Sequence, residues 1–287
     1  MTNRLLMENF MQAIFKRWGI ISSIVATVFF GLSAGTAMAA PSGGLLIAMG
    51  DSVSAGLGLD PLASATGFDQ SCGRSSQAYP MLVAAAHNLQ LANVSCSGAR
   101  VFDGLLTDQE RAMDTVPAQL RQARDAGRPT AVTMTIMAND VYWTQWLAYC
   151  RYGNCGSASD TATFNFLLAK SRAELWGAMA YTQSLGPDHI YSTGYYDPFG
   201  SDTSCFESKG FTASEISWLR ARLSDLNHSI ANVDRWFPRA TFVPIQFGDR
   251  GFCSPDSLIQ GPDDPAPFHP TAAGQRKIAQ AINKAWR

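Results

Sequence analysis

The chain has 287 residues, of which 46% are apolar and 16% are charged. An apolar fraction this high excludes an intrinsically disordered chain, which combines low hydrophobicity with high charge. The formal net charge is −1, from 22 basic and 23 acidic side chains. The sequence therefore lacks the basic excess typical of nucleic-acid-binding proteins, and we expect no nucleic-acid partner.

The N-terminal segment 1–39 is predicted to be a secretory signal peptide. Basic residues at its start precede the uncharged, mostly apolar stretch 19–35, and Ala37-Met-Ala39 supplies small residues where signal peptidases cleave. An uncleaved membrane anchor is the alternative, although about 17 uncharged residues are the short limit for a membrane span. We expect residues 40–287 to be one exported domain, secreted or periplasmic, without stable membrane insertion.

Residues 40–287 alternate short apolar runs with helical patterns. The pattern predicts strands at 45–49, 93–96, 131–137, 189–195 and 241–245, and helices at 77–91, 116–126, 163–185, 213–236 and from 271 onward. Short continuous apolar runs are typical of strands buried on both faces of a parallel sheet. The alternation predicts an α/β fold, a three-layer α/β/α sandwich with a central, mostly parallel sheet.

The exported chain contains an even number of cysteines. An even count in an oxidising compartment favours disulfides, although six cysteines allow fifteen pairings that the sequence alone does not choose between. A zinc site is the alternative, but only one pair is closely spaced and no histidine lies near it. The six are Cys72, Cys96, Cys150, Cys155, Cys205 and Cys253.

Four residues that suit acyl transfer follow the predicted strands or precede the last helix. Ser52 follows the first strand, Gly98 the second and Asn139 the third, while His269 precedes the last helix. Taken singly, each has a plain explanation as a helix cap or turn residue. Because the carboxyl ends of parallel strands meet at one edge, we expect these residues to converge. Together they supply a nucleophile, a general base and oxyanion donors.

The segments around these residues resemble the four sequence blocks of the GDSL/SGNH esterase and lipase superfamily. The similarity is strongest to its secreted, disulfide-bearing branch, known from actinobacterial lipases. The blocks read Met49-Gly-Asp-Ser-Val-Ser-Ala-Gly56, Ser95-Cys-Ser-Gly-Ala99, Ile136-Met-Ala-Asn-Asp140 and Phe268-His-Pro-Thr-Ala-Ala-Gly274. The resemblance implies a flavodoxin-like α/β fold for nearly the whole predicted mature chain.

The resemblance also implies a role for each site residue. Ser52 is expected to be the nucleophile and His269 the general base. The main-chain N–H groups of Ser52 and Gly98 and the side-chain amide of Asn139 are expected to hold the oxyanion. The branch further favours disulfides between consecutive cysteines, which are Cys72–Cys96, Cys150–Cys155 and Cys205–Cys253.

Two positions depart from the superfamily pattern. Ala266 stands where an aspartate commonly orients the histidine. A main-chain carbonyl near Ala266 would then orient the imidazole, or else Asp264 or Asp263 would reach it. In the third block, Met137 occupies a position that is often glycine. A side chain there predicts a narrower pocket or a different loop path.

The sequence thus predicts a secreted carboxylic ester hydrolase, an esterase or lipase that acts through an acyl-enzyme. A polysaccharide O-deacetylase or an acyltransferase on the same site is the alternative. We expect a small-molecule or lipid ester as substrate, a monomer, no cofactor and no metal. The aromatic side chains of Tyr142, Trp146 and Tyr149 recur at helical spacing after Asn139, where they either line an acyl pocket or pack into the core.

Overall fold

The computed structural model describes residues 43–64, 67–112 and 114–287. The predicted signal peptide and its cleavage site lie outside these residues, so that interpretation stays a prediction. None of the helices in the described part has the length and apolar character needed to cross a bilayer.

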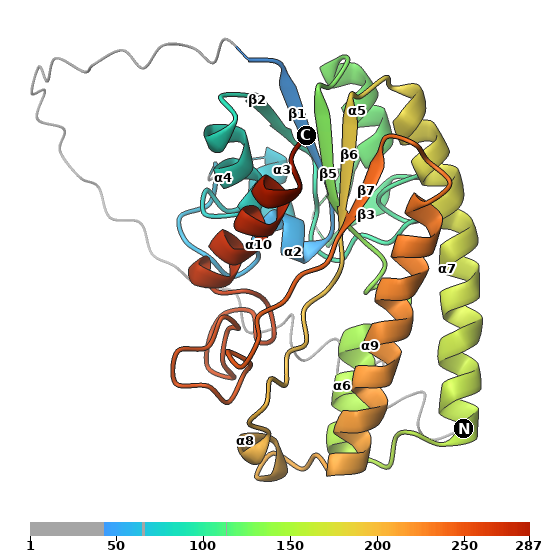
Figure 1. Cartoon of the computed structure of the whole chain (residues 1–287), viewed down its shortest axis with the longest axis vertical. Helices are drawn as coiled ribbons and strands as arrows, with labels where there is room; N and C mark the ends of the chain where they lie inside the picture. Colours follow the sequence, from blue (N-terminus) through green and yellow to red (C-terminus); the bar gives the residue numbers. More distant parts are fainter. Residues whose placement is uncertain (1–42, 65–66, 113) are drawn as a thin grey trace, which may run out of the picture. The chain divides into compact units, whose positions relative to one another are not determined.

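Five parallel strands form the central sheet, in the spatial order β2-β1-β5-β6-β7 (Figure 1). β1 and β5 are buried almost throughout, as their continuous apolar runs predict. Leu46 of β1 lies beside Ala131 and Gly50 beside Thr135, so the two strands end level with each other. The strands are β1 (Leu45–Gly50), β2 (Gln90–Asn93), β5 (Ala131–Thr135), β6 (His189–Thr193) and β7 (Ala240–Val243).

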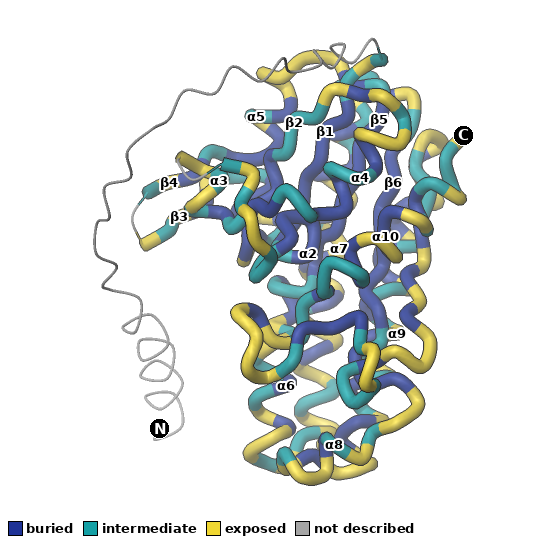
Figure 2. Tube along the Cα trace, turned by 90° about the vertical axis from the view of Figure 1, so that its left-hand side faces the viewer, coloured by how far each residue is buried: buried dark blue, intermediate teal, exposed yellow. Residues whose placement is uncertain are grey.

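Helices cover both faces of this sheet, which confirms the predicted α/β fold. α4 (Tyr79–Ala86) and α10 (Ala272–Ala285) pack together on one face. α5 (Gln119–Ala126), α7 (Ala158–Ser184) and α9 (Ala213–Asp234) lie on the other (Figure 1). The strands are buried between the two layers, whereas the helices expose their outer sides (Figure 2).

Short elements fill the loops between the main helices and strands. They are the helices α2 (Ser52–Ala55), α3 (Gly67–Cys72), α6 (Trp143–Tyr152) and α8 (Ser204–Glu207), and the antiparallel pair of β3 (Gln109–Glu110) with β4 (Thr115–Val116). α2 begins directly after β1, and α6 begins a few residues after β5. These short helices therefore lie at the carboxyl edge of the sheet, where sites in such folds are found.

Several element boundaries differ from the sequence prediction. The helix predicted at 77–91 ends at Ala86, because Gln90 pairs with β1 and opens β2 three residues before the predicted strand. α7 begins five residues before its predicted start, since Ser157 and Asp160 form a capping box. In each case a hydrogen bond that the apolar pattern does not register sets the boundary.

Three disulfides join the six cysteines in the pairing that the resemblance implies. They are Cys72–Cys96, Cys150–Cys155 and Cys205–Cys253. The first ties α3 to the turn after β2. The third ties α8 to the loop after β7, beside an aromatic cluster in which Phe206 and Phe252 contact Phe268. Phe268 directly precedes His269 in the chain.

Removing the Cys205–Cys253 disulfide should destabilise the protein more than removing Cys150–Cys155. The first closes 48 residues and the second only 5. Chain entropy then gives a loss of about 4 kcal/mol against about 2 kcal/mol. Differential scanning calorimetry of the two double Cys→Ser variants should show the Tm falling about twice as far for Cys205/Cys253. A larger fall for Cys150/Cys155 would contradict this expectation.

Candidate active site

Ser52 is positioned by a tight turn between β1 and α2. Gly50 has a φ of +127°, and a Cβ atom there would collide with the carbonyl oxygen of Thr135 in the neighbouring strand. The Asp51 N–H donates to that same carbonyl at 2.8 Å. The Asp51 side chain caps α2 by accepting the Val53 N–H at 2.9 Å. The turn therefore needs glycine and fixes Ser52 as the first residue of a short helix.

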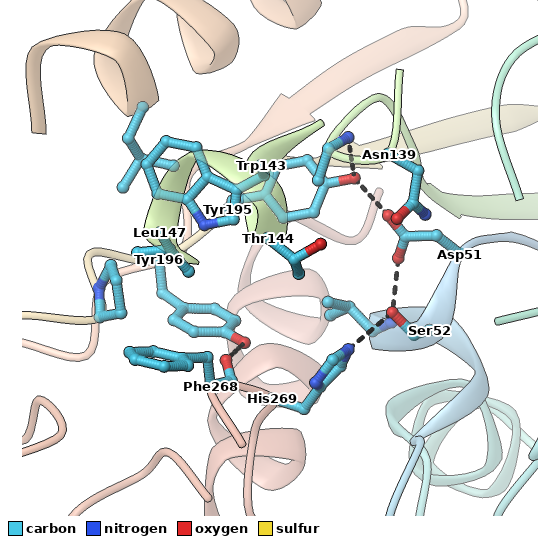
Figure 3. A pocket seen from close by; sticks show the side chains of 14 residues that line it. Asp51, Ser52, Asn139, Trp143, Thr144, Leu147, Tyr195, Tyr196, Phe268 and His269 are labelled. Atoms are coloured by element: carbon cyan, nitrogen blue, oxygen red, sulfur yellow. Dashed lines mark hydrogen bonds between the residues drawn. The ribbon is translucent and has the colours of Figure 1, made fainter. Parts of the chain in front are cut away.

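The structure brings Ser52 and His269 together across 217 residues. Nε2 of His269 lies 2.7 Å from Oγ of Ser52 (Figure 3). Nδ1 of His269 lies 3.2 Å from the carbonyl oxygen of Pro267. Burial lowers the pKa of His269 below its ordinary value, while the carbonyl groups of Pro267 and Ala266 oppose that shift. The imidazole is therefore neutral at pH 7, the form that accepts a proton from a serine.

Neither of the two candidate acids hydrogen-bonds to His269. The Asp264 carboxylate accepts the Gly261 N–H at 2.6 Å, which holds it within its own turn. Asp263 is exposed, and no hydrogen bond joins it to His269 in the part of the chain that the structure describes. The group beside Nδ1 is instead the main-chain carbonyl of Pro267. Pro267 follows Ala266, near which such a carbonyl was one of the two expected alternatives.

The expected oxyanion donors lie in three segments, which follow β1, β2 and β5. Among the described residues, neither the Ser52 N–H nor the Gly98 N–H donates to a protein acceptor. The side-chain amide of Asn139 donates to the Ala99 carbonyl at 2.9 Å, which uses one of its two hydrogens. Asp140 accepts the Val101 N–H, so the third block is tied to the turn that carries Gly98.

Tyr195 connects the first block to the third and was missed by the sequence analysis. Its hydroxyl donates to Asp51 Oδ2 at 2.5 Å and accepts the Ala138 N–H at 3.0 Å. Burial raises the pKa of Asp51 to about 7, although the bonds from Tyr195 and Val53 act to lower it. The only sequence signal for Tyr195 was its place at the end of the apolar run 189–195.

Met137 adopts the backbone conformation that glycine would have at this position. Its φ is +110°, and its side chain is fully buried. A positive φ strains a residue with a Cβ atom, so the surrounding contacts must hold it. The bond from the next residue, Ala138, to Tyr195 is one of them. The contacts of the loop therefore hold Met137 in a strained backbone conformation.

Gln260 holds the loop that carries His269, and it was also missed. Its side-chain amide donates to the carbonyls of Leu57 and Pro270 and accepts the Ala266 N–H. Its main-chain N–H donates to the His269 carbonyl at 2.7 Å. This one buried side chain therefore joins the histidine loop to the segment after α2. A single glutamine in a polar loop carries no sequence signal of that role.

An aromatic pocket opens beside Ser52 and His269. Its volume is about 50 Å³, and it is walled on one side by α6. Trp143 and Leu147 of α6 line it, whereas Tyr142, Trp146 and Tyr149, for which a pocket wall and core packing were the two alternatives, do not. Trp146 packs against Phe164 and Trp218, while the other two are largely exposed. Tyr196, Pro198, Leu223 and Phe268 complete the apolar wall.

The metal alternative finds no support in the described residues, which contain no group of three or more histidine, cysteine or acidic side chains placed to hold an ion. The cysteines of the zinc alternative are all joined in disulfides.

Comparison with known proteins identifies the family. The model of the GDSL-like lipase/acylhydrolase family matches residues 48–277. Lipase 2 of Streptomyces coelicolor is 26% identical over 280 residues, which cover 89% of this chain and 92% of the relative.

Two solved structures share the fold. The extracellular lipase of Streptomyces rimosus is 24% identical with a TM-score of 0.63, covering 85% of this chain and all of that one. Phospholipase A1 of Streptomyces albidoflavus is 23% identical with a TM-score of 0.64, covering 84% and 98%. The chain belongs to the GDSL-like lipase/acylhydrolase family and is a carboxylic ester hydrolase.

Proposed function

We propose that the protein hydrolyses esters through an acyl-enzyme on Ser52. The observation that carries this proposal is the 2.7 Å contact between Ser52 Oγ and His269 Nε2. His269 takes the proton as Oγ bonds to the ester carbonyl carbon, and the carbonyl electron pair moves onto oxygen. The N–H groups of Ser52 and Gly98 and the Asn139 amide stabilise that oxyanion. When the C–O bond breaks, His269 gives the proton to the leaving alcohol.

Deacylation repeats these steps with water as the nucleophile. His269 removes a proton from water, whose oxygen bonds to the acyl carbon, and returns the proton to Ser52 Oγ as the acid leaves. The Pro267 carbonyl beside Nδ1 fixes the tautomer with the lone pair on Nε2. A carbonyl offers no full negative charge to the imidazolium, so orientation is its main contribution.

The protein works outside the cytoplasm in this proposal. The basic, apolar and small-residue segments of 1–39 are typical of a cleaved secretory signal. The three disulfides fit an oxidising compartment. One solved relative is itself described as an extracellular lipase.

The preferred acyl group is short. The pocket beside Ser52 has a volume of about 50 Å³. This volume is small compared with that of a long acyl chain. Trp143, Phe268 and Tyr196 wall the pocket, and large rings do not yield space as readily as methionine or leucine. We therefore expect butyrate esters to be preferred, because a longer chain has to displace a ring or extend out of this pocket.

Replacing Ser52 with alanine should abolish turnover. Without Oγ no acyl-enzyme forms, and kcat should fall about 10⁴- to 10⁶-fold. The measurement is hydrolysis of p-nitrophenyl butyrate by residues 40–287, with circular dichroism to verify the fold. The exposed Ser184→Ala on α7 is the matched control and should keep full activity. Turnover retained by Ser52→Ala would remove Ser52 from its proposed role.

Asp264→Asn should change kcat less than about twofold, because its carboxylate bonds to Gly261 rather than to His269. Loss of an aspartate that orients a catalytic histidine lowers kcat by about 10⁴. Steady-state measurement of kcat for the native protein and for Asp264→Asn distinguishes a twofold change from a 10⁴-fold loss. A loss near the larger value would make Asp264 the orienting acid.

The acid limb of the pH profile should lie below pH 6.5. His269 acts as a base only when neutral, and burial lowers its pKa from 6.5. Activity is therefore present above the lowered pKa and is lost as pH falls through it. The profile of kcat/KM for p-nitrophenyl butyrate between pH 4 and 9 reports this value for the free enzyme. A midpoint above 6.5 would contradict the assignment.

Trp143→Ala should broaden the acyl-chain range. Each methylene that a pocket accepts or rejects changes the rate by about tenfold or more. In the native protein we expect kcat/KM for p-nitrophenyl esters to peak at butyrate and fall towards octanoate. The variant should raise the octanoate-to-butyrate ratio about tenfold, whereas Trp176→Ala, on the exposed face of α7, should leave it unchanged. A native optimum at long chains would refute the short-acyl assignment.

A further inference from the structure

The peptide group between Ser97 and Gly98 receives two hydrogen bonds on its carbonyl side. Arg111 Nη1 donates to the Ser97 carbonyl oxygen at 2.5 Å, and Gln109 Nε2 donates to it at 2.9 Å. The Ser97 carbonyl and the Gly98 N–H are the two ends of one peptide group. Gly98 N–H is a proposed oxyanion donor, so these two side chains contact the far end of that donor.

The two donors lie directly against Gly98. A Cβ atom added to Gly98 would lie 3.5 Å from both Arg111 Nη1 and Gln109 Nε2. Gln109 is 5% exposed, and Arg111 is partly buried. The guanidinium therefore acts in surroundings where its hydrogen bond is less weakened by water than at an open surface.

The Arg111 guanidinium is held in place by a second carbonyl. Its Nη2 donates to Ser71 O at 2.6 Å, at the end of α3. The planar guanidinium thus joins two separate carbonyls. A lysine ammonium at the same position could not reproduce this two-pronged geometry. Arg111 belongs to the β3–β4 turn, so this contact ties three segments together at the Ser97–Gly98 peptide.

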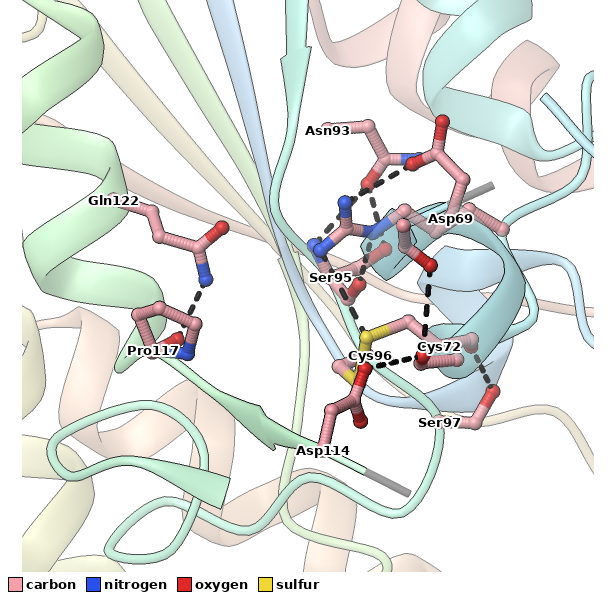
Figure 4. A network of polar contacts seen from close by, with 12 residues as sticks. Asp69, Cys72, Asn93, Ser95, Cys96, Ser97, Asp114, Pro117 and Gln122 are labelled. Atoms are coloured by element: carbon pink, nitrogen blue, oxygen red, sulfur yellow. Dashed lines mark hydrogen bonds and ion pairs between the residues drawn. A yellow bond between two sulfur atoms is a disulfide. The ribbon is translucent and has the colours of Figure 1, made fainter. Parts of the chain in front are cut away.

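The turn that carries Ser97 and Gly98 is also held by hydrogen bonds to Cys72 of the first disulfide. Ser97 Oγ donates to the Cys72 carbonyl at 2.6 Å, and the Ser97 N–H donates to it at 3.1 Å. Figure 4 shows Ser97 beside the Cys72–Cys96 disulfide, with Asp114 nearby. Gly98 has a φ of +79°, a backbone conformation that residues with a Cβ atom rarely adopt, so glycine suits this turn.

A cation on a peptide carbonyl strengthens the N–H at the other end. Electron density moves toward the carbonyl oxygen, so the N–H becomes a stronger donor, and hydrogen bonds in such a chain reinforce each other. A fixed peptide plane also spares the reorientation that a loose donor would need when the oxyanion forms. The stronger donor and the fixed peptide plane both stabilise the transition state more than the ground state, because negative charge develops on the substrate oxygen only during the reaction. Neither effect requires contact between Arg111 and the substrate.

We propose that Arg111, assisted by Gln109, is a positioning residue that orients and polarises the Ser97–Gly98 peptide as an oxyanion donor. This inference rests on the proposed function, because it assigns Gly98 the oxyanion role. Arg111 then acts on the transition state and leaves ground-state binding almost unchanged. A purely structural role, in which Arg111 only ties the β3–β4 turn to α3, predicts lower stability with unchanged kinetic constants.

The test compares Arg111→Met and Arg111→Lys with the control Arg121→Met. Arg121 lies on α5, pairs with Asp108 at the surface and does not contact the Ser97–Gly98 peptide. For each protein we would measure kcat and KM for p-nitrophenyl butyrate, and Ki for 1-butaneboronic acid and for p-nitrophenyl butyl ether. The boronic acid bonds to Ser52 Oγ as the serine proton passes to His269, and the resulting tetrahedral boronate anion places a hydroxyl oxygen among the oxyanion donors. The ether forms no such adduct.

Removing a whole oxyanion donor costs about 10²–10³ in rate, so weakening one should cost about tenfold. In Arg111→Met, kcat should fall and the boronic acid Ki should rise, each about tenfold. KM and the ether Ki should change less than about twofold. Arg111→Lys should restore part of kcat because one ammonium donor reaches Ser97 O, and Arg121→Met should match the native protein.

Two results would overturn the inference. If Arg111→Met lowers Tm but keeps kcat and the boronic acid Ki, Arg111 is only structural. If the boronic acid Ki and the ether Ki rise together, Arg111 shapes the pocket rather than the oxyanion donor. Ser52→Ala is measured alongside, since retained turnover there refutes the proposed function itself, whereas an inactive Ser52→Ala with a fully active Arg111→Met refutes this inference alone.

Discussion

The hydrogen bond between Ser52 and His269 joins two segments that no common helix or sheet pairing holds together. Ser52 is fixed by the turn after β1, where Asp51 bonds to Thr135 of the neighbouring strand. His269 lies in a loop that Gln260 ties to the residues after α2. The 2.7 Å contact persists only while both segments hold their places. Much of the structure around the site serves that requirement.

Buried glutamine side chains hold several of these segments through hydrogen bonds to the main chain. Gln119 bonds both main-chain groups of Gly50, and Gln275 joins the Tyr79 N–H to the Val53 carbonyl. A glutamine amide carries a donor and an acceptor, so one side chain satisfies two main-chain groups that lack regular partners. A neutral amide is also easier to bury than a charge. The loops at the sheet edge are thereby tied to helices of both layers.

Backbone strain gathers around the same pocket. Met137, Tyr142 and Phe268 all have positive φ angles, which residues with a Cβ atom rarely adopt. Hydrogen bonds with two tyrosines hold the strained main chain, since Tyr195 accepts the Ala138 N–H and Tyr196 donates to the Phe268 carbonyl. Strain that neighbouring contacts hold in place is a common feature of functional sites. Here it lets a methionine occupy a positive-φ position that glycine would adopt without strain.

The sequence by itself determined the α/β class, the main buried strands, the positions of Ser52 and Asn139 after strands and that of His269 before the last helix. Apolar runs and local motifs carry that information because they depend on near neighbours in the chain. Only the tertiary structure decided that Pro267 rather than Asp264 lies beside His269, and that Tyr195, Gln260 and Arg111 support the site. Those partners lie across loops, and a polar side chain in a loop bonds to whatever group the fold brings within about 3 Å.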